Sequence, residues 1–367
     1  MTTLTRVAPQ TAAPLRARVR GSRVAVVFAG LAAALVVAVL VAAGRGQLDI
    51  PPGEVLDSIL RRLGDLVGWN LGSVPTHPQG DNALWEVRFP RVALGVVVGA
   101  ALATAGAMMQ GVFGNPLAEP GVVGVSAGAA LAAASAIAFG ITVAGIWTIP
   151  LFAFLGGLAT TLLVYLMSRD GGRTEVVTLV LTGIAVNAVA QAGMALVMFM
   201  ADTQAREQIV FWTLGSLNGT RWQYVGVVAP LCVAGILGAM LLSRQLDLLS
   251  LGDRAARHVG VDVERLRIKA IFLVAVLTAA AVSFCGVIGF VGLVVPHLIR
   301  IVLGPGHRLL LPASALAGAV LLVVADLFAR TLVEYADLPI GMLTALVGGP
   351  FFFWLLRRTR RTAGGWA

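Results

Sequence analysis

The apolar second half of the chain is interrupted by one long charged stretch, RQLDLLSLGDRAARHVGVDVERLRIK, which runs from Arg244 to Lys269. Apolar residues recur in it at helical spacing, at Leu248, Leu251, Ala255 and Val259. Ser250 is placed to N-cap this short helix, with Asp253 completing a capping-box pattern, and Gly260 is placed to end it. Asp262 is placed to cap a second short helix. The stretch therefore predicts a stiff, amphipathic helical hairpin between two apolar segments.

The composition of the whole chain indicates a membrane protein. Of its 367 residues, 58% are hydrophobic and 12% are charged, whereas soluble globular domains are nearer a quarter charged. Several apolar runs exceed the roughly 18 residues that indicate a membrane span. The predicted fold class is an all-α polytopic membrane protein. Cys232 and Cys285 both lie inside apolar runs, so we expect buried thiols without a disulfide or metal framework.

Ten apolar segments are predicted to cross the membrane. They cover residues 24–43, 92–112, 122–139, 146–167, 176–200, 224–242, 270–285, a short segment ending near 303, 311–331 and 339–356. No charged residue lies between Lys269 and Arg300, and we expect a turn at Gly286, Gly289 and Gly292 to divide that region into two spans. The membrane domain is thus predicted over 24–356, with a basic N-terminus at 1–23 and a basic tail at 357–367. Residues 53–67 are expected to form a short helix, and 202–222 an interfacial segment.

The basic net charge of +9 follows the predicted topology. With both termini in the cytoplasm, the cytoplasmic segments hold 19 of the 27 Lys and Arg residues. Such an excess is typical of the cytoplasmic loops of membrane proteins. The charge therefore indicates orientation rather than nucleic-acid binding, and it places the hairpin in the cytoplasm.

The sequence contains few motifs that are typical of catalysis or of nucleotide or metal binding. The sequence has no Gly-rich phosphate-binding loop, so no ATP binding by that device is expected. Asp326 is the one carboxylate inside a predicted span. For this residue we favour a role in helix packing over a role in a proton relay. An ion-coupled secondary transporter using Asp326 is an alternative, but further buried ionisable residues and inverted repeats are missing. An intramembrane enzyme using His297 or His307 is a third hypothesis, and it lacks a paired acid, base or metal set.

Other polar and soft side chains lie in or beside spans. Asn187 and Gln191 share one face of the segment 176–200. Their side chains are expected either to form interhelical hydrogen bonds or to line a pore. Methionines at 194 and 198 suit core filling as well as a substrate path. Three arginines lie at the ends of spans or just outside them, namely Arg88, Arg91 and Arg330. They are either interface anchors or a docking site for a carboxylate-bearing external partner.

Six ordered blocks of the sequence resemble the FecCD-type permeases, the membrane subunits of type II ABC importers for iron-siderophores, haem and cobalamin. The first is RFPRVALGVVVGAALATAGAMMQGVFGNPLAEPGVVGVSAGA, Arg88 to Ala129. The others are FWTLGSL (211–217), LGDRAARHVGVD (251–262), GVIGFVGLVVPHLIR (286–300), LPASALAGA (311–319) and LPIGMLTALVGGPFFFWLL (338–356). The resemblance extends from about residue 47 to the end of the chain.

The resemblance implies ten spans, a homodimer with a central translocation path, and a place in the bacterial cytoplasmic membrane among membrane lipids. It implies two cytoplasmic ATPase subunits, which carry ATP and Mg²⁺, and an external substrate-binding lipoprotein. The segment 249–266 matches the coupling helices, with Leu251, Gly252, Asp253, Arg254, Ala256, Arg257, His258 and Gly260 as ATPase contacts.

The same resemblance assigns docking and gating residues. Arg88, Arg91 and Arg330 match arginines that receive glutamates of the binding protein. Asn115 and Leu117 match one gate layer and Val176 and Val177 the other, with Asn187, Gln191, Met194 and Met198 along the path. The chain is expected to be no enzyme and to hold no covalently bound cofactor. Haem is the favoured substrate, because the FWTLGSL block, the turn at 304–307 and the start of the last span resemble the haem-type branch; ferric siderophore and cobalamin are the alternatives.

Overall fold

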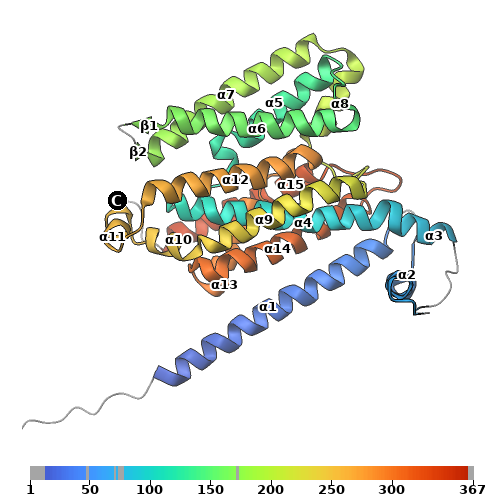
Figure 1. Ribbon diagram of the computed structural model, residues 1–367, viewed down its shortest axis with the longest axis horizontal. Coiled ribbons are helices and arrows are strands. Elements are labelled where there is room, and N and C mark those ends of the chain that lie inside the picture. Colours follow the sequence, from blue (N-terminus) through green and yellow to red (C-terminus); the bar gives the residue numbers. More distant parts are fainter. Residues whose placement is uncertain (1–12, 47–48, 70–71, 73–77, 171–172, 363–367) are drawn as a thin grey trace, which may run out of the picture.

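The computed structural model describes residues 13–46, 49–69, 72, 78–170 and 173–362, and these form an almost wholly helical protein (Figure 1). The long helices are α1 (Ala13–Gly44), α2 (Pro52–Val67), α4 (Phe89–Phe113), α5 (Val125–Ala138), α6 (Thr148–Met167), α7 (Val176–Met200), α8 (Thr203–Thr213), α9 (Trp222–Leu241), α12 (Val263–Cys285), α13 (Val291–Leu303), α14 (His307–Ala329) and α15 (Ile340–Thr362). Short elements are α3 (Pro78–Ala83), the π-helical η1 (Leu84–Arg88), the 3-10 turns η2 (Pro120–Val123) and η3 (Gly145–Trp147), α10 (Ser243–Leu249), α11 (Asp253–His258) and the strands β1 (Arg169–Asp170) and β2 (Arg173–Thr174).

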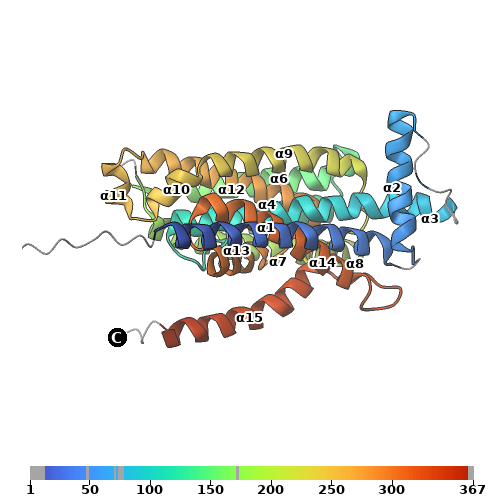
Figure 2. The same cartoon turned by 90° about the horizontal axis from the view of Figure 1, so that it is seen from below.

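The prediction of an all-α polytopic membrane fold is confirmed. Seven described helical segments are long and apolar enough to cross a membrane, and three apolar helices are shorter, namely Val125–Ala138, Val291–Leu303 and Ile340–Trp354. Seven of the ten predicted spans overlap the longer segments and three overlap the shorter apolar helices, so the count of ten crossings stays a prediction. The start of α1 and the end of α15 lie at the same end of the molecule as α10 and α11 (Figures 1 and 2).

Helix α4 lies at the centre of the bundle, where α9, α12, α13 and α14 surround it. Small residues let backbones approach one another there, as close packing in membranes requires. A Cβ on Gly99 would lie 2.3 Å from the Gly318 carbonyl oxygen of α14, and one on Gly106 would lie 1.8 Å from that of Gly292 in α13. The small residues of α4 therefore allow α13 and α14 to pack against its backbone.

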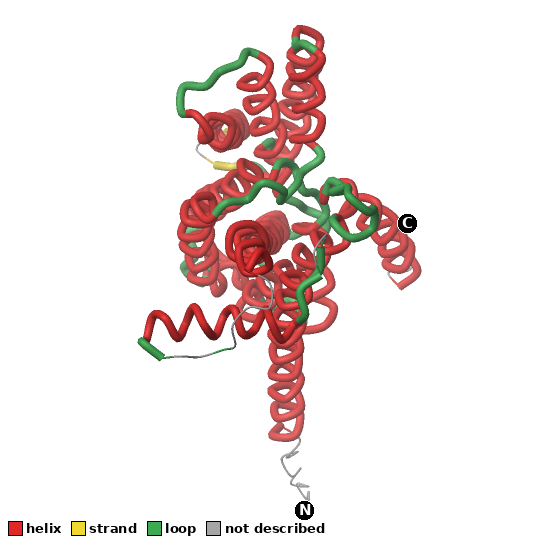
Figure 3. The backbone as a smooth tube through the Cα atoms, turned by 90° about the vertical axis from the view of Figure 1, so that its right-hand side faces the viewer, coloured by secondary structure: helices red, strands yellow, loops and turns green. Residues whose placement is uncertain are grey.

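The outer helices expose apolar faces. Helices α1 and α7 bury little of their length inside the chain, and α5, α6, α7 and α8 form a group on one flank of the bundle (Figure 1). Helix α15 projects away from the other helices (Figure 2). Seen along the bundle, this C-terminal helix leaves to one side while most helices appear end on (Figure 3).

The hairpin differs from its prediction in two capping details. Ser250 does not cap α11, because its hydroxyl donates to the Asp247 carbonyl at 2.6 Å and closes the end of α10. The N-cap of α11 is Gly252, at φ +98°. Asp262 does act as an N-cap, accepting from the Arg265 amide at 3.0 Å, but it caps the long helix α12 rather than a second short helix.

One further prediction of local structure was wrong. Gly292 is not part of the glycine turn, because it lies in the first turn of α13, where it packs on α4. After α6, Arg169 pairs with Thr174 and Asp170 with Arg173 in a small antiparallel ladder. That ladder rests on contacts with α12, which is distant in sequence.

Candidate functional site

The hairpin α10–α11 forms one polar end of the molecule, on the left of Figure 1. Leu251 and Val259 frame α11 with side chains that are 67% and 58% exposed, while Ala256 between them is fully buried. The two turns that flank α11 are glycines in the left-handed region, Gly252 at φ +98° and Gly260 at φ +87°. This conformation favours glycine over residues with a Cβ. The hairpin therefore presents apolar side chains outward on tightly turned backbone.

Polar contacts fix the hairpin to the start of α12 and to the β1–β2 ladder. Arg267 donates to Asp253 at 2.9 Å and to the Thr174 carbonyl at 3.2 Å. Glu264 accepts from the Thr174 amide at 2.9 Å and from its hydroxyl at 2.5 Å. Of these residues only Asp253 was among the predicted coupling residues. Sequence reasoning missed the others because the loop before α7 gives no signal of which charged residue it contacts.

Asp247 ties the hairpin to α14. Its Oδ1 accepts from the His307 amide at 2.6 Å and lies 2.8 Å from His307 Nδ1. His307 is buried at the first position of α14, so its imidazole serves here as an anchor. A helix of 23 residues is about 34 Å long at 1.5 Å per residue. Helix α14 thus links the hairpin to the far end of the molecule.

The far end holds the three predicted arginines. Arg91 is buried between two carboxylates, with Asp326 at 2.9 Å and Asp337 at 2.8 Å. Arg88 donates to the carbonyls of Ala43 and Gly44 at 2.7 and 2.9 Å. These carbonyls end α1 and lack intrahelical partners. The arginines therefore join α4 to the ends of α1 and α14.

Arg330 completes this cluster. It donates to the carbonyls of Arg45, at 3.0 Å, and Ala42, and its Nε lies 3.6 Å from Asp326. Burial lowers the pKa of the Arg330 guanidinium, and the neighbouring Asp326 opposes that shift. All three arginines line one polar cavity of about 410 Å³, together with Asn218, Tyr335 and Asp337 among others. Positive groups are thus gathered around a hollow at this end.

Asp326 has the packing role that its position favoured. It is 1% exposed and pairs with Arg91 of α4 and Arg330 after α14. A buried carboxylate held by two guanidiniums joins α14 to α4, and both of its charged partners are arginines, which stay protonated in proteins and so cannot pass a proton on. The ion-coupled alternative therefore gains no support from this site.

The predicted path residues of α7 lie along one helix but make different kinds of contact. The Asn187 amide donates to the Gly121 carbonyl at 3.2 Å, joining α7 to η2. Methionines 194 and 198 pack against an apolar cluster that contains Ile137, Val197 and Ile209, while Gln191 and Val177 are exposed. Asn115 accepts from the Leu117 amide at 2.9 Å in the turn after α4. Val176 is partly exposed at the start of α7, and the path role of the set stays a prediction.

Two polar ends on an apolar helical bundle, one built around arginines and the other presenting a rigid hairpin, are the arrangement of a multi-pass membrane protein. The match to known proteins makes this specific. The chain belongs to the FecCD transport family, whose family model matches residues 34–358. The predicted resemblance to that family is confirmed.

Named relatives are similar over most of the chain. The hemin transport system permease protein HmuU of Yersinia pestis is 43% identical over 302 residues, covering 78% of this chain and 87% of the relative. The cobalamin import system permease protein BtuC of Halobacterium salinarum is 42% identical, over 74% of this chain and 72% of the relative. The Fe(3+) dicitrate transport system permease protein FecD of Escherichia coli is 41% identical, over 76% and 86%.

Solved structures are similar too. A structure described as an inward-facing conformation of a metal-chelate type ABC transporter has a TM-score of 0.78 and 32% identity, covering 91% of this chain and 99% of that one. PsaBC from Streptococcus pneumoniae has a TM-score of 0.53 at 15% identity, covering 72% and 88%, which shows a shared fold.

Proposed function

We propose that this chain is the membrane permease subunit of an ATP-driven importer of the FecCD family. The observation that carries the proposal is the hairpin, because a chain without a nucleotide-binding motif presents exposed Leu251 and Val259 on a rigidly seated α11. Such a surface suits a groove on a separate ATPase. ATP binding and hydrolysis on that partner would bias the permease between outward- and inward-facing states through differential contacts.

The assembly we propose has ten membrane crossings per chain, two copies of the chain around a central path, and two ATPase subunits. The hairpin faces the cytoplasm and both termini lie on that side, which is supported by the excess of Lys and Arg in these segments. The arginine cavity then faces an external substrate-binding lipoprotein. The gate and path residues of the predicted set keep the roles that the family resemblance implies.

Haem is the substrate that we propose. The support is the 43% identity to a hemin permease, together with the FWTLGSL block of the sequence. Relatives for cobalamin and ferric dicitrate at 42% and 41% identity make iron chelates and cobalamin the competing classes. Spectral titration of the co-encoded binding protein with haem, ferric siderophores and cobalamin decides among them; binding of cobalamin alone would overturn the haem assignment.

Changing the exposed apolar surface of the hairpin is expected to uncouple transport. Leu251→Asp places a charge on a side chain that is 67% exposed, so the fold is retained while an apolar contact with the ATPase is lost. Central apolar contacts at interfaces carry roughly 2 kcal/mol or more, and ATPase affinity should therefore fall at least about tenfold. Co-purification of the ATPase and ATP-driven uptake in proteoliposomes measure the effect.

The matched control is Val143→Asp, which changes an apolar side chain that is 80% exposed in the turn between α5 and α6, at the other end of the molecule. ATPase affinity should stay unchanged in that variant. Equal ATPase affinity in the Leu251→Asp variant would refute the coupling role. Uptake driven by a proton gradient without the ATPase would instead refute the proposed class of transporter.

Charge at the arginine cavity is expected to govern docking of the external binding protein. Arg88 is 6% exposed but lines the cavity. Arg88→Glu should weaken docking, and most at low ionic strength, because attraction between charges that approach through water is screened over about 8 Å at physiological salt. Arg88→Lys keeps the positive charge and should retain most of the affinity. The affinity is measured on protein whose thermal unfolding matches the parent. Equal affinity for the Glu and Lys variants would leave Arg88 as a cap of α1 only.

A further inference from the structure

An apolar groove runs along the outer seam between α6 and α12. Near the hairpin end it encloses about 300 Å³ between Leu162 and Tyr165 of α6 and Ile268 and Phe272 of α12. Its lining is almost wholly apolar, and Leu162, Ile268 and Phe272 are exposed. This volume is at the lower end of the range for sites that hold small organic ligands.

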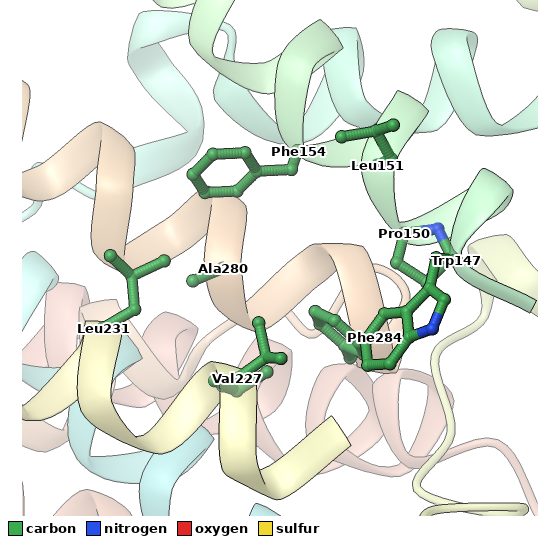
Figure 4. A pocket seen from close by; sticks show the side chains of 9 residues that line it. Trp147, Pro150, Leu151, Phe154, Val227, Leu231, Ala280 and Phe284 are labelled. Atoms are coloured by element: carbon green, nitrogen blue, oxygen red, sulfur yellow. The ribbon is translucent and has the colours of Figure 1, made fainter. Parts of the chain in front are cut away.

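A second hollow follows along the same seam, towards the other end of the bundle. It encloses about 200 Å³ between Trp147 and Phe154 on one side and Leu231 and Phe284 on the other. Figure 4 shows these side chains, which come from η3, α6, α9 and α12. Phe154 lines this hollow and Leu158, one helical turn further along α6, lines the first. The seam is therefore apolar along most of α6.

The occupant of such a seam in a multi-pass membrane protein is set by what surrounds it. Acyl chains lie against outward-facing apolar helices, but lipid tails are as apolar as leucine, so apolar contact alone selects no particular lipid. Selection requires a polar group at the level of the headgroups. Candidates for such a group lie near the hollow at the hairpin end.

Basic side chains stand at the mouth of the hollow near the hairpin. The Arg169 guanidinium lies 5.7 Å from the centroid of the Tyr165 ring, and tyrosine is typical of the membrane–water interface. Lys269 is exposed, follows Ile268 directly and precedes Phe272 by one helical turn. Residues three apart on a helix are neighbours on its surface. Arg169 and Lys269 therefore flank the groove from its two walls.

Two nearby carboxylates have partners of their own. Glu264 accepts two hydrogen bonds from Thr174 and one from the Tyr165 hydroxyl at 3.5 Å, and Asp262 caps α12 and pairs with Arg265 at 2.9 Å. Neither hollow has a basic side chain in its lining itself, so the cations that could select a headgroup are those that stand beside the groove. Basic groups beside an apolar groove between helices are the chemistry that binds anionic lipid headgroups.

We propose that the α6–α12 groove near the hairpin holds one acyl chain of an anionic phospholipid from the leaflet at that end, with its phosphate between Arg169 and Lys269. The apolar walls position the chain, and the two cations select the headgroup. Because β1 begins with Arg169 and the β1–β2 ladder contacts Glu264 and Arg267, the bound lipid also lies against the segment on which the hairpin is seated.

Native mass spectrometry tests this on the full-length chain, released with its ATPase from nanodiscs of equal parts phosphatidylglycerol and phosphatidylcholine. The parent should retain phosphatidylglycerol preferentially. Each basic residue near a membrane surface contributes about 1 kcal/mol, or roughly fivefold in lipid retention. Arg169→Ala and Lys269→Ala should each reduce retained phosphatidylglycerol by about that factor, and the double variant should show no preference. Leu162→Trp, which fills the groove, should displace the lipid with both cations intact.

Two matched variants serve as controls. Arg221→Ala removes an exposed arginine before α9, and Leu151→Trp fills the second hollow; neither should change phosphatidylglycerol retention. Unchanged retention in the Arg169→Ala, Lys269→Ala double variant overturns the proposal. A loss of the dimer mass in Leu162→Trp, without loss of lipid, also overturns it, because the groove would then be covered by a second copy of the chain.

Discussion

Gly106→Ala is expected to prevent most of the chain from reaching its folded state. A Cβ at this position would lie 1.8 Å from the Gly292 carbonyl oxygen and 2.5 Å from its Cα, and backbone atoms cannot move aside as a flexible side chain can. Overpacking with side-chain contacts costs about 1–3 kcal/mol. Here the whole of α13 must shift from α4, so we expect a loss of at least about 3 kcal/mol.

The measurement is the monodisperse fraction after detergent extraction, together with the thermal unfolding midpoint of what remains. Gly226→Ala is the matched control, because Gly226 also lies inside a long helix, α9, and a Cβ there would meet nothing within 4 Å. That variant should be neutral or stabilised by up to about 1 kcal/mol through helix propensity. Equal behaviour of the two variants would show that α4 and α13 are not held at this contact.

Gly106 also shows what the sequence predicted and what it did not. Small residues at repeated helical spacing predict close helix packing, and this is where α4 meets its neighbours. The partner is unpredictable from the pattern, because Gly292 reads as one more turn glycine after Cys285 and Gly286. Only the three-dimensional arrangement reveals that α13 begins at Val291.

Spans were predicted well where apolar runs end at charge. The segment 176–200 coincides with α7, since Glu175 and Asp202 bound it in the sequence. Helix α12 was predicted to start at 270 and starts at Val263, because its first turns carry charged side chains that contact the β1–β2 ladder rather than lipid. A hydropathy argument cannot distinguish such a charged first turn from a loop.

In the hairpin and the arginine cluster, too, some features follow from the local sequence and others depend on contacts made only in the fold. The exposed, amphipathic nature of Arg244–Lys269 follows from local spacing. The contacts that seat it, Arg267 with Thr174 and Asp247 with His307, join residues far apart in sequence. Likewise the arginines were identified by position beside spans, whereas Arg88 and Arg330 donate to helix-end carbonyls, which any residue type provides.

Arg91→Ala is the second variant expected to have a large effect, because it removes the central cation of the buried cluster. It leaves Asp326, 1% exposed, with Arg330 at 3.6 Å as its remaining charged partner. Breaking a buried ion pair from one side costs about 3–5 kcal/mol. Asp326→Ala should cost less, since Arg91 keeps Asp337 at 2.8 Å. The double variant should cost less than the two single losses together, with a coupling of about 0.5–3 kcal/mol.

Unfolding free energies in mild detergent measure this cycle, and Arg45→Ala is its control. Arg45 pairs with Asp49 at 3.0 Å, but both side chains are about two-thirds exposed, at 65% and 64%. Exposed pairs contribute about 0–1 kcal/mol, so this loss should be small. If Arg91→Ala costs no more than Arg45→Ala, the buried cluster is not what joins α4 to α14. The Arg91 guanidinium would then be free to meet a carboxylate of the external partner, so one cycle separates a structural arginine from a docking arginine.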